Sequence, residues 1–271
     1  MPDKTAGFIT VALSLALFSA LLSCASDNAS LQIENSLPQN ELTRYNDSFD
    51  KMREDLWDRA DDLYREEQMQ NFKPANMYFK DGKLLLQTQT EGFSKGGLVS
   101  KYRLRGDFDI QLDFLMDFTR ETAVEYMDQL FVMGVFDNRR QTAKINAVTI
   151  GLSIRWGDEQ GYLFSLGFIN GKRKSSFGNR KQGFSDKINN FKGSFRIVRT
   201  GEYISTLYKE AGATDWTQKL TARVSANDML FGIQLRNFFP ESTTIRAKHP
   251  IKAMIDRFTV NAAHNIIEEK I

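Results

Sequence analysis

The densest regularly spaced group of acidic side chains lies in residues 106–118. Apart from Leu115, every second position there is polar, and this polar set is Asp107, Asp109, Gln111, Asp113 and Asp117. Successive side chains of a strand point to opposite faces, so this set would share one face, with neighbours about 6.8 Å apart. That spacing suits a solvated surface, a surface that hydrogen-bonds a polyhydroxylated ligand, or an inverting carboxylate pair formed by Asp107 and Asp109.

The intervening positions of the same stretch are apolar. They are Phe108, Ile110, Leu112, Phe114, Met116 and Phe118. A strand with one apolar face packs that face on a second layer, so the stretch predicts a sandwich of two sheets. Whether the acidic face meets solvent or a ligand then decides what the protein does.

The chain from Asn76 onward repeats this kind of patterning. Short apolar alternations are separated by turn residues, and Asp81-Gly82 and Asn170-Gly171 are dipeptides that favour tight hairpins. No helical period occurs between Asn76 and Thr217. The sequence therefore predicts one all-β domain, a sandwich of two antiparallel sheets.

Charged residues are frequent in residues 49–72, where apolar side chains recur every three or four positions. This period predicts a short N-terminal helical segment. We expect the domain, including this segment, to cover residues 49–262. A polar tether is expected over residues 24–48, and a frayed or helical tail over residues 263–271.

The N-terminus has the pattern of an export signal. Residues 8–22 form an apolar run too short for a membrane-spanning helix, and the run ends in Leu21-Leu22-Ser23-Cys24. This ending resembles the lipobox of bacterial lipoproteins, and Cys24 is the only cysteine. The resemblance implies that residues 1–23 are removed and that acyl chains on Cys24, palmitate among them, hold the protein on a membrane. We expect a location in the bacterial cell envelope, on the outer membrane if the cell is Gram-negative, because Ala25 follows the cysteine.

Composition argues against several kinds of partner and site. Lys plus Arg number 36 and Asp plus Glu 34, so a net charge of +2 gives no reason to expect nucleic-acid binding. His249 and His264 are the only histidines, and neither lies near a candidate nucleophile, so catalytic triads and zinc sites are not expected. We expect no cofactor; a calcium ion pinning the termini of the domain would need Asp50 and Asp256.

A second alternating stretch covers residues 147–156. Its apolar positions alternate with Thr149, Gly151, Ser153 and Arg155, and Trp156 follows. Small residues before an arginine suit the floor of a ligand groove, and an exposed indole could stack on a sugar ring. Small residues also occur where a sheet curves tightly, and a tryptophan at a strand end often caps a core. Arg155 and Trp156 therefore join Asp109, Gln111 and Asp113 as candidate binding residues.

Several segments resemble concanavalin A-like lectin and glucanase domains in register over about residues 70–262. The resemblance rests on residues 72–77, 81–86, 97–102, 106–110, 193–201 and 255–260, with Trp216 between the last two. It implies a jelly roll with one sheet curved around a groove. Domains of this fold include lectins, laminarinase-type glycoside hydrolases, polysaccharide lyases and adhesive modules, so the fold alone does not choose a function.

The hydrolases of this fold carry Glu-x-Asp-x-Glu or Glu-x-Asp-x-x-Glu on a strand soon after the one that residues 106–114 resemble. The corresponding region here offers Glu125 and Asp128. Residues three apart point to opposite faces of a regular strand, so this pair reaches a common substrate only across a bulge. The sequence therefore favours binding without catalysis.

Three hypotheses follow from the residues and the resemblance. The first is a lipid-anchored envelope protein whose jelly roll binds carbohydrate or another envelope ligand without catalysis. The second is a glycoside hydrolase with a rearranged pair drawn from Asp107, Asp109, Asp113, Glu125 and Asp128. The third is a structural or protein-binding envelope lipoprotein.

Overall fold

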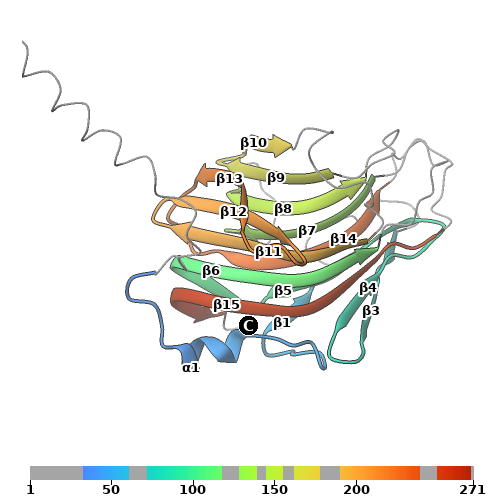
Figure 1. Ribbon diagram of the computed structural model, residues 1–271, viewed down its shortest axis with the longest axis horizontal. Coiled ribbons are helices and arrows are strands. Elements are labelled where there is room, and N and C mark those ends of the chain that lie inside the picture. The colour runs from blue at the N-terminus through green and yellow to red at the C-terminus, as the bar shows by residue number, and fades with distance from the viewer. Residues whose placement is uncertain are drawn as a thin grey trace, which may run out of the picture. The chain divides into compact units, whose positions relative to one another are not determined.

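Two stacked β-sheets account for most of the chain in the computed structural model, which describes residues 33–60, 72–117, 128–138, 145–154, 162–177, 190–238 and 249–269 (Figure 1). One sheet runs in the order β1-β5-β14-β7-β8-β9-β10, with β2 parallel to β5, and the other in the order β13-β12-β11-β6-β15-β4-β3. All other pairings between these strands are antiparallel. The predicted all-β sandwich is confirmed.

The strands of the two sheets have the following bounds. The eight-stranded sheet contains β1 (Trp57–Arg59), β2 (Phe72–Pro74), β5 (Phe93–Ser100), β7 (Asp128–Phe136), β8 (Ala147–Ile154), β9 (Tyr162–Ile169), β10 (Lys172–Phe177) and β14 (Leu230–Phe238). The seven-stranded sheet contains β3 (Asn76–Phe79), β4 (Leu84–Gln87), β6 (Tyr102–Asp117), β11 (Asn190–Thr200), β12 (Tyr203–Glu210), β13 (Thr217–Arg223) and β15 (Lys252–Glu268).

The central strand β6 has the two faces that its sequence predicts. The side chains of Phe108, Ile110, Leu112, Phe114 and Met116 are at most 1% exposed and lie in the core between the sheets, whereas Leu115 is half-buried on the other face. Facing them from the other sheet are side chains such as Phe131 and Phe231. The rings of Phe114 and Phe131 lie 4.6 Å apart, so the two layers interlock through aromatic contacts.

Both predicted hairpin turns are present. Asp81 and Gly82 have φ of 53° and 66°, and Asn170 and Gly171 have φ of 49° and 75°. Two successive residues with positive φ are typical of the tight turn whose twist matches that of the paired strands. The turns therefore fix the registers of the β3–β4 and β9–β10 hairpins.

The N-terminal segment, residues 33–60, packs on the domain instead of forming a tether up to Ser48. Its short helices are α1 (Gln39–Leu42) and the 3-10 helix η1 (Thr43–Tyr45), and Leu42 and Tyr45 are buried in the core. Asp47 pairs with Phe258 in β15 through two backbone hydrogen bonds of 2.9 and 3.0 Å. Figure 1 shows this blue segment beside β15 and β1.

The helical segment therefore lies earlier than predicted. Within residues 49–60 the chain forms turns and then β1, and residues 61–71 lie outside the described chain. The reason is tertiary: Phe49 has a left-handed φ of 56°, and Leu56 and Trp57 are both buried although they are adjacent. A residue in the left-handed conformation interrupts an α-helix, and the pairing of Trp57 with Ser100 of β5 holds the following residues in an edge strand.

The C-terminal tail is also different from the expectation. Residues 263–268 continue β15, which pairs with β6 as far as Glu268 and Tyr102. Pairing along nearly the whole of β6 gives the tail backbone partners that no frayed end has. In the part of the chain that the structure describes, no helix is long and apolar enough to cross a membrane.

Candidate functional site

The predicted acidic face of β6 is the outer face of the seven-stranded sheet. Asp109 is 2% exposed, and both of its carboxylate oxygens accept hydrogen bonds from the guanidinium of Arg196 in β11. Asn261 in β15 donates a further hydrogen bond to Asp109 at 3.1 Å. Cross-strand neighbours from both sides therefore occupy this carboxylate.

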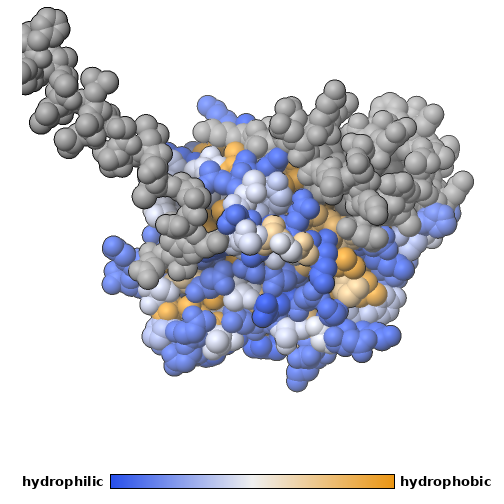
Figure 2. Space-filling model, in the orientation of Figure 1, coloured by the Kyte–Doolittle hydropathy of each residue, from blue (hydrophilic) through white to orange (hydrophobic). Residues whose placement is uncertain are grey.

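Asp113 is held in the same way. It accepts hydrogen bonds of 2.7 Å from both Gln111 and Ser194, and Arg257 forms an ion pair with it at 3.2 Å. Figure 2 shows that the surface over β6, β11 and β15 is largely hydrophilic. The structure brings the predicted residues Asp109, Gln111 and Asp113 together, but as members of an internal network whose polar groups already have partners.

The outer face of the eight-stranded sheet has a different chemistry. Ile150 and Leu152 of β8 lie in the core, so Thr149, Gly151 and Ser153 face outward, as the sequence alternation predicts. The register places glycines on four neighbouring strands, β5, β14, β7 and β8. We call this set the glycine cluster: Gly97, Gly232, Gly134 and Gly151.

Side chains of neighbouring strands lie directly over this glycine cluster. A Cβ added to Gly151 would lie 2.7 Å from the Phe164 ring, and one added to Gly232 would lie 3.0 Å from the Phe136 ring. Thr149 occupies the corresponding space over Gly134. The glycines thus leave room for these side chains close to the backbone of the sheet, and Phe136 remains partly exposed. A partly exposed ring can stack on an apolar face of a ligand.

Gln234 lies in the middle of this face. It belongs to β14, and its neighbours Ile233 and Leu235 point into the core, so its amide points outward. Gln234 is only 7% exposed, and no hydrogen bond joins its side chain to any other residue that the structure describes. A nearly buried amide normally has hydrogen-bond partners in the protein. Because Gln234 has none among the described residues, its two donors and its acceptor are available to a ligand. The sequence identifies β14 as a strand but not this amide, because its isolation depends on the register.

The same face lacks a carboxylate pair in its described central strands. Outward positions of β5, β14, β7 and β8 carry no aspartate or glutamate after Asp128, the first residue of β7, whose side chain lies outside the description. Glu125, Arg155, Trp156 and Cys24 also lie outside the described residues. No acid and base are therefore seen to face a common position on this sheet.

The calcium candidates Asp50 and Asp256 have protein partners. Asp50 accepts a hydrogen bond from Ser48 at 2.8 Å, and Asp256 forms an ion pair with Lys83. Among the described residues, no group of three or more His, Cys, Asp or Glu side chains is placed to hold a metal ion. Lys83 supplies the positive charge beside Asp256.

Comparison with known proteins gives a fold relationship. No protein-family model matches the chain, and no curated protein matches it either. A LamA variant from Zobellia galactanivorans, solved in complex with laminaritriose and laminaritetraose, matches with a TM-score of 0.51 and 10% identity over 84% of this chain and 98% of that one.

Two further solved structures match at a similar level. The alginate lyase from Klebsiella pneumoniae has a TM-score of 0.50 and 11% identity over 80% of this chain and 99% of that one. Rv0315, an immunostimulatory antigen and pseudo beta-1,3-glucanase of Mycobacterium tuberculosis, has a TM-score of 0.50 and 9% identity over 81% and 98%. Together with the two-sheet topology, these matches show that the chain has the concanavalin A-like jelly-roll fold of laminarinase-type proteins.

Proposed function

We propose that this chain is a lipid-anchored cell-envelope protein whose jelly roll binds carbohydrate without cleaving it. The observation that carries the proposal is Gln234, a nearly buried amide beside Gly97 that has no hydrogen-bond partner among the described residues. Sugar hydroxyls both donate and accept hydrogen bonds, as a primary amide does. The solved structures of this fold include one with laminarioligosaccharides bound, which supports the choice of ligand class.

The ligand would lie across β5, β14, β7 and β8. The partly exposed ring of Phe136 would stack on a sugar face, while Gln234, Thr149 and Arg236 would hydrogen-bond to hydroxyls. The absence of a carboxylate pair from the described central positions of this face favours binding over hydrolysis. The hydrolase alternative remains tied to Glu125 and Asp128.

Retention in native gels that contain laminarin or alginate tests the binding. The purified full chain should migrate more slowly in at least one of these gels. Gln234→Ala should remove most of this retardation, because it deletes the central donor and acceptor but little of the surface. Thr259→Ala on the outer face of the other sheet is the matched control and should migrate like the parent chain.

Two results would contradict this proposal. One is unretarded migration of the parent chain with every glycan tried, and the other is an equal loss from Thr259→Ala. Release of reducing sugar that disappears in Glu125→Gln or Asp128→Asn would instead establish the hydrolase alternative.

The lipid anchor needs its own test. Cys24→Ser in the expressing cell should move the protein from the membrane fraction to the soluble fraction, because no thiol remains to be acylated. Mass spectrometry of the parent N-terminus should find acyl chains on Cys24. An unmodified cysteine would exclude the anchor and leave the binding proposal intact.

A further inference from the structure

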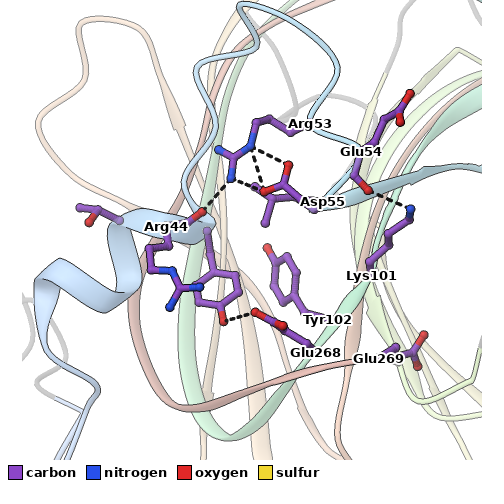
Figure 3. A pocket seen from close by; sticks show the side chains of 11 residues that line it. Arg44, Arg53, Glu54, Asp55, Lys101, Tyr102, Glu268 and Glu269 are labelled. Carbon is purple, nitrogen blue, oxygen red and sulfur yellow. Dashed lines mark hydrogen bonds and ion pairs between the residues drawn. The ribbon is translucent and has the colours of Figure 1, made fainter. Parts of the chain in front are cut away.

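A pocket of about 550 Å³ lies where the N-terminal segment meets the start of β6 and the end of β15 (Figure 3). Its lining comes from η1, residues 53–56, Lys101, Tyr102 and the last residues of β15. Small-molecule sites in proteins commonly have volumes of about 300–1,000 Å³. The pocket shares no residue with the glycine cluster.

Most charged groups around this pocket neutralise one another. Arg53 donates three hydrogen bonds of 2.6–3.2 Å to the carboxylate of Asp55. The other ion pairs join Lys101 to Asp58 at 3.3 Å and Arg103 to Glu269 at 2.7 Å. These pairs hold the walls in place without attracting a ligand of either charge.

Three charged groups are left over: Glu54, Glu268 and Arg44 have no ion pair with any residue in the described part of the chain. Glu268 accepts only a long hydrogen bond of 3.4 Å from Tyr45. Burial, and after it the charge of Glu268, raises the pKa of Tyr45. The lining therefore has one carboxylate more than it has cations, and this favours a positively charged group in the ligand.

The hydroxyl of Tyr102 supplies a second, independent sign of a ligand. Tyr102 is 1% exposed, and its hydroxyl has no hydrogen-bond partner within the described residues. Figure 3 shows that this hydroxyl points toward the side chains of Arg53 and Asp55, at the inner wall of the pocket. A buried hydroxyl without a partner costs about 1–3 kcal/mol, so a site that keeps one has a donor to offer.

We propose that this pocket binds a monosaccharide-sized ligand with a protonated amine, of which an amino sugar is the simplest form. The ammonium would form an ion pair with Glu268. Hydroxyl groups of the ligand would accept hydrogen bonds from Arg44, and one that enters deeply would meet Tyr102. The ammonium group and the hydroxyls of such a ligand would thus pair with Glu268, Arg44 and Tyr102, whose side chains form no strong hydrogen bond or ion pair with the described residues.

Calorimetric titration of the full chain in detergent with glucosamine, glucose and glucuronate tests this proposal. Glucosamine should bind saturably, glucose at least about tenfold more weakly because it lacks the charged partner of Glu268, and glucuronate not at all. Glu268→Gln should weaken glucosamine binding about tenfold, and Tyr102→Phe about fivefold, with both variants remaining folded.

Glu202→Gln is the matched control, since it removes an exposed carboxylate that is paired with Arg223. It should bind glucosamine like the parent chain. Equal affinity for glucose and glucosamine, no saturable binding, or an equal loss in Glu202→Gln would each overturn the proposal. Laminarin retention depends on other residues, so the two sites can fail separately.

Discussion

At the scale of single residues, Asp47 organises the N-terminal segment. One of its oxygens accepts a hydrogen bond from the backbone N–H of Phe49 and the other from Nε1 of Trp57, both at 2.7 Å. Burial nevertheless raises the pKa of Asp47, and these two hydrogen bonds oppose the shift only in part. Both oxygens of the carboxylate thus accept a hydrogen bond, but the negative charge is poorly solvated because the group is buried.

This shift predicts a pH dependence of stability. The folded state holds the proton of Asp47 more tightly than the unfolded chain does, so this residue stabilises the fold at low pH. That contribution is lost as the pH rises from the ordinary carboxyl pKa through the raised one, by up to about 1.4 kcal/mol per pH unit. Denaturant titrations at several pH values across this range give the free energy of unfolding as a function of pH. This dependence should differ between the parent chain and Asp47→Asn. Thr259→Ala provides the control, because it removes no titratable group and should leave this pH dependence unchanged.

Tyr102 gives the second prediction at this scale. Its hydroxyl is buried without a partner, so Tyr102→Phe should raise the free energy of unfolding of the unliganded chain by about 1 kcal/mol. The matched variant Tyr45→Phe removes a hydroxyl that is bonded to Glu268 and should not stabilise the fold. A stability loss in Tyr102→Phe, measured by denaturant unfolding, would mean that the hydroxyl has a partner.

At the scale of strands, the glycine cluster leads to a prediction about stability. A Cβ at Gly151 would lie 2.6 Å from the backbone oxygen of Phe131 in the neighbouring strand, and this oxygen cannot move without disturbing the sheet. Gly151→Ala should therefore lower the free energy of unfolding by about 2 kcal/mol. Lys192→Ala, at an exposed position of the other sheet, should change it by less than about 0.5 kcal/mol. Equal unfolding midpoints for the two variants would show that the sheet relaxes around the added methyl.

Local patterning explains which elements could be predicted. The alternation of residues 106–118, broken only at Leu115, predicts β6, and the Asp81-Gly82 and Asn170-Gly171 dipeptides predict two turns, because each signal acts within a few residues. The segment from Phe49 to Trp57 could not be predicted in this way. Its conformation depends on Asp47 binding Trp57 and on the turn in which Arg53 O accepts hydrogen bonds from both Leu56 and Trp57.

The candidate sites were predictable only in part, since a site depends on register. Asp109 and Asp113 share a face as expected, yet only the pairing of β6 with β11 and β15 brings Arg196 and Arg257 to them. Likewise, no spacing in the sequence relates Gly97 to Gly151, or η1 to Glu268. Asp109 and Arg196 are 87 positions apart, Asp113 and Arg257 are 144 apart, and such distant segments must pair before these surfaces exist.

At the scale of the whole molecule, the N-terminal segment is part of the fold. Residues 33–271 form one compact unit. We expect a chain that starts at Ile33 to unfold at the same denaturant concentration as the full chain. A chain that starts at Phe49 loses the burial of Leu42 and Tyr45, each worth about 1.5–3 kcal/mol, and should be less stable by at least about 3 kcal/mol. Equal midpoints for both truncations would show that the segment only lies on the surface.

The contacts between this segment and β15 also determine how the domain would respond to tension. A pull on the chain before Ile33 first reaches the hydrogen bonds of Ser36 and Leu37 with Ala263, and later those of Asp47 with Phe258. These bonds would break one after another, as in peeling, while the hydrogen bonds between β15 and β6 stay unstrained. If the chain is held through residues before Ile33, as proposed, this release would lengthen the connection to the membrane under force before the two sheets lost their shape.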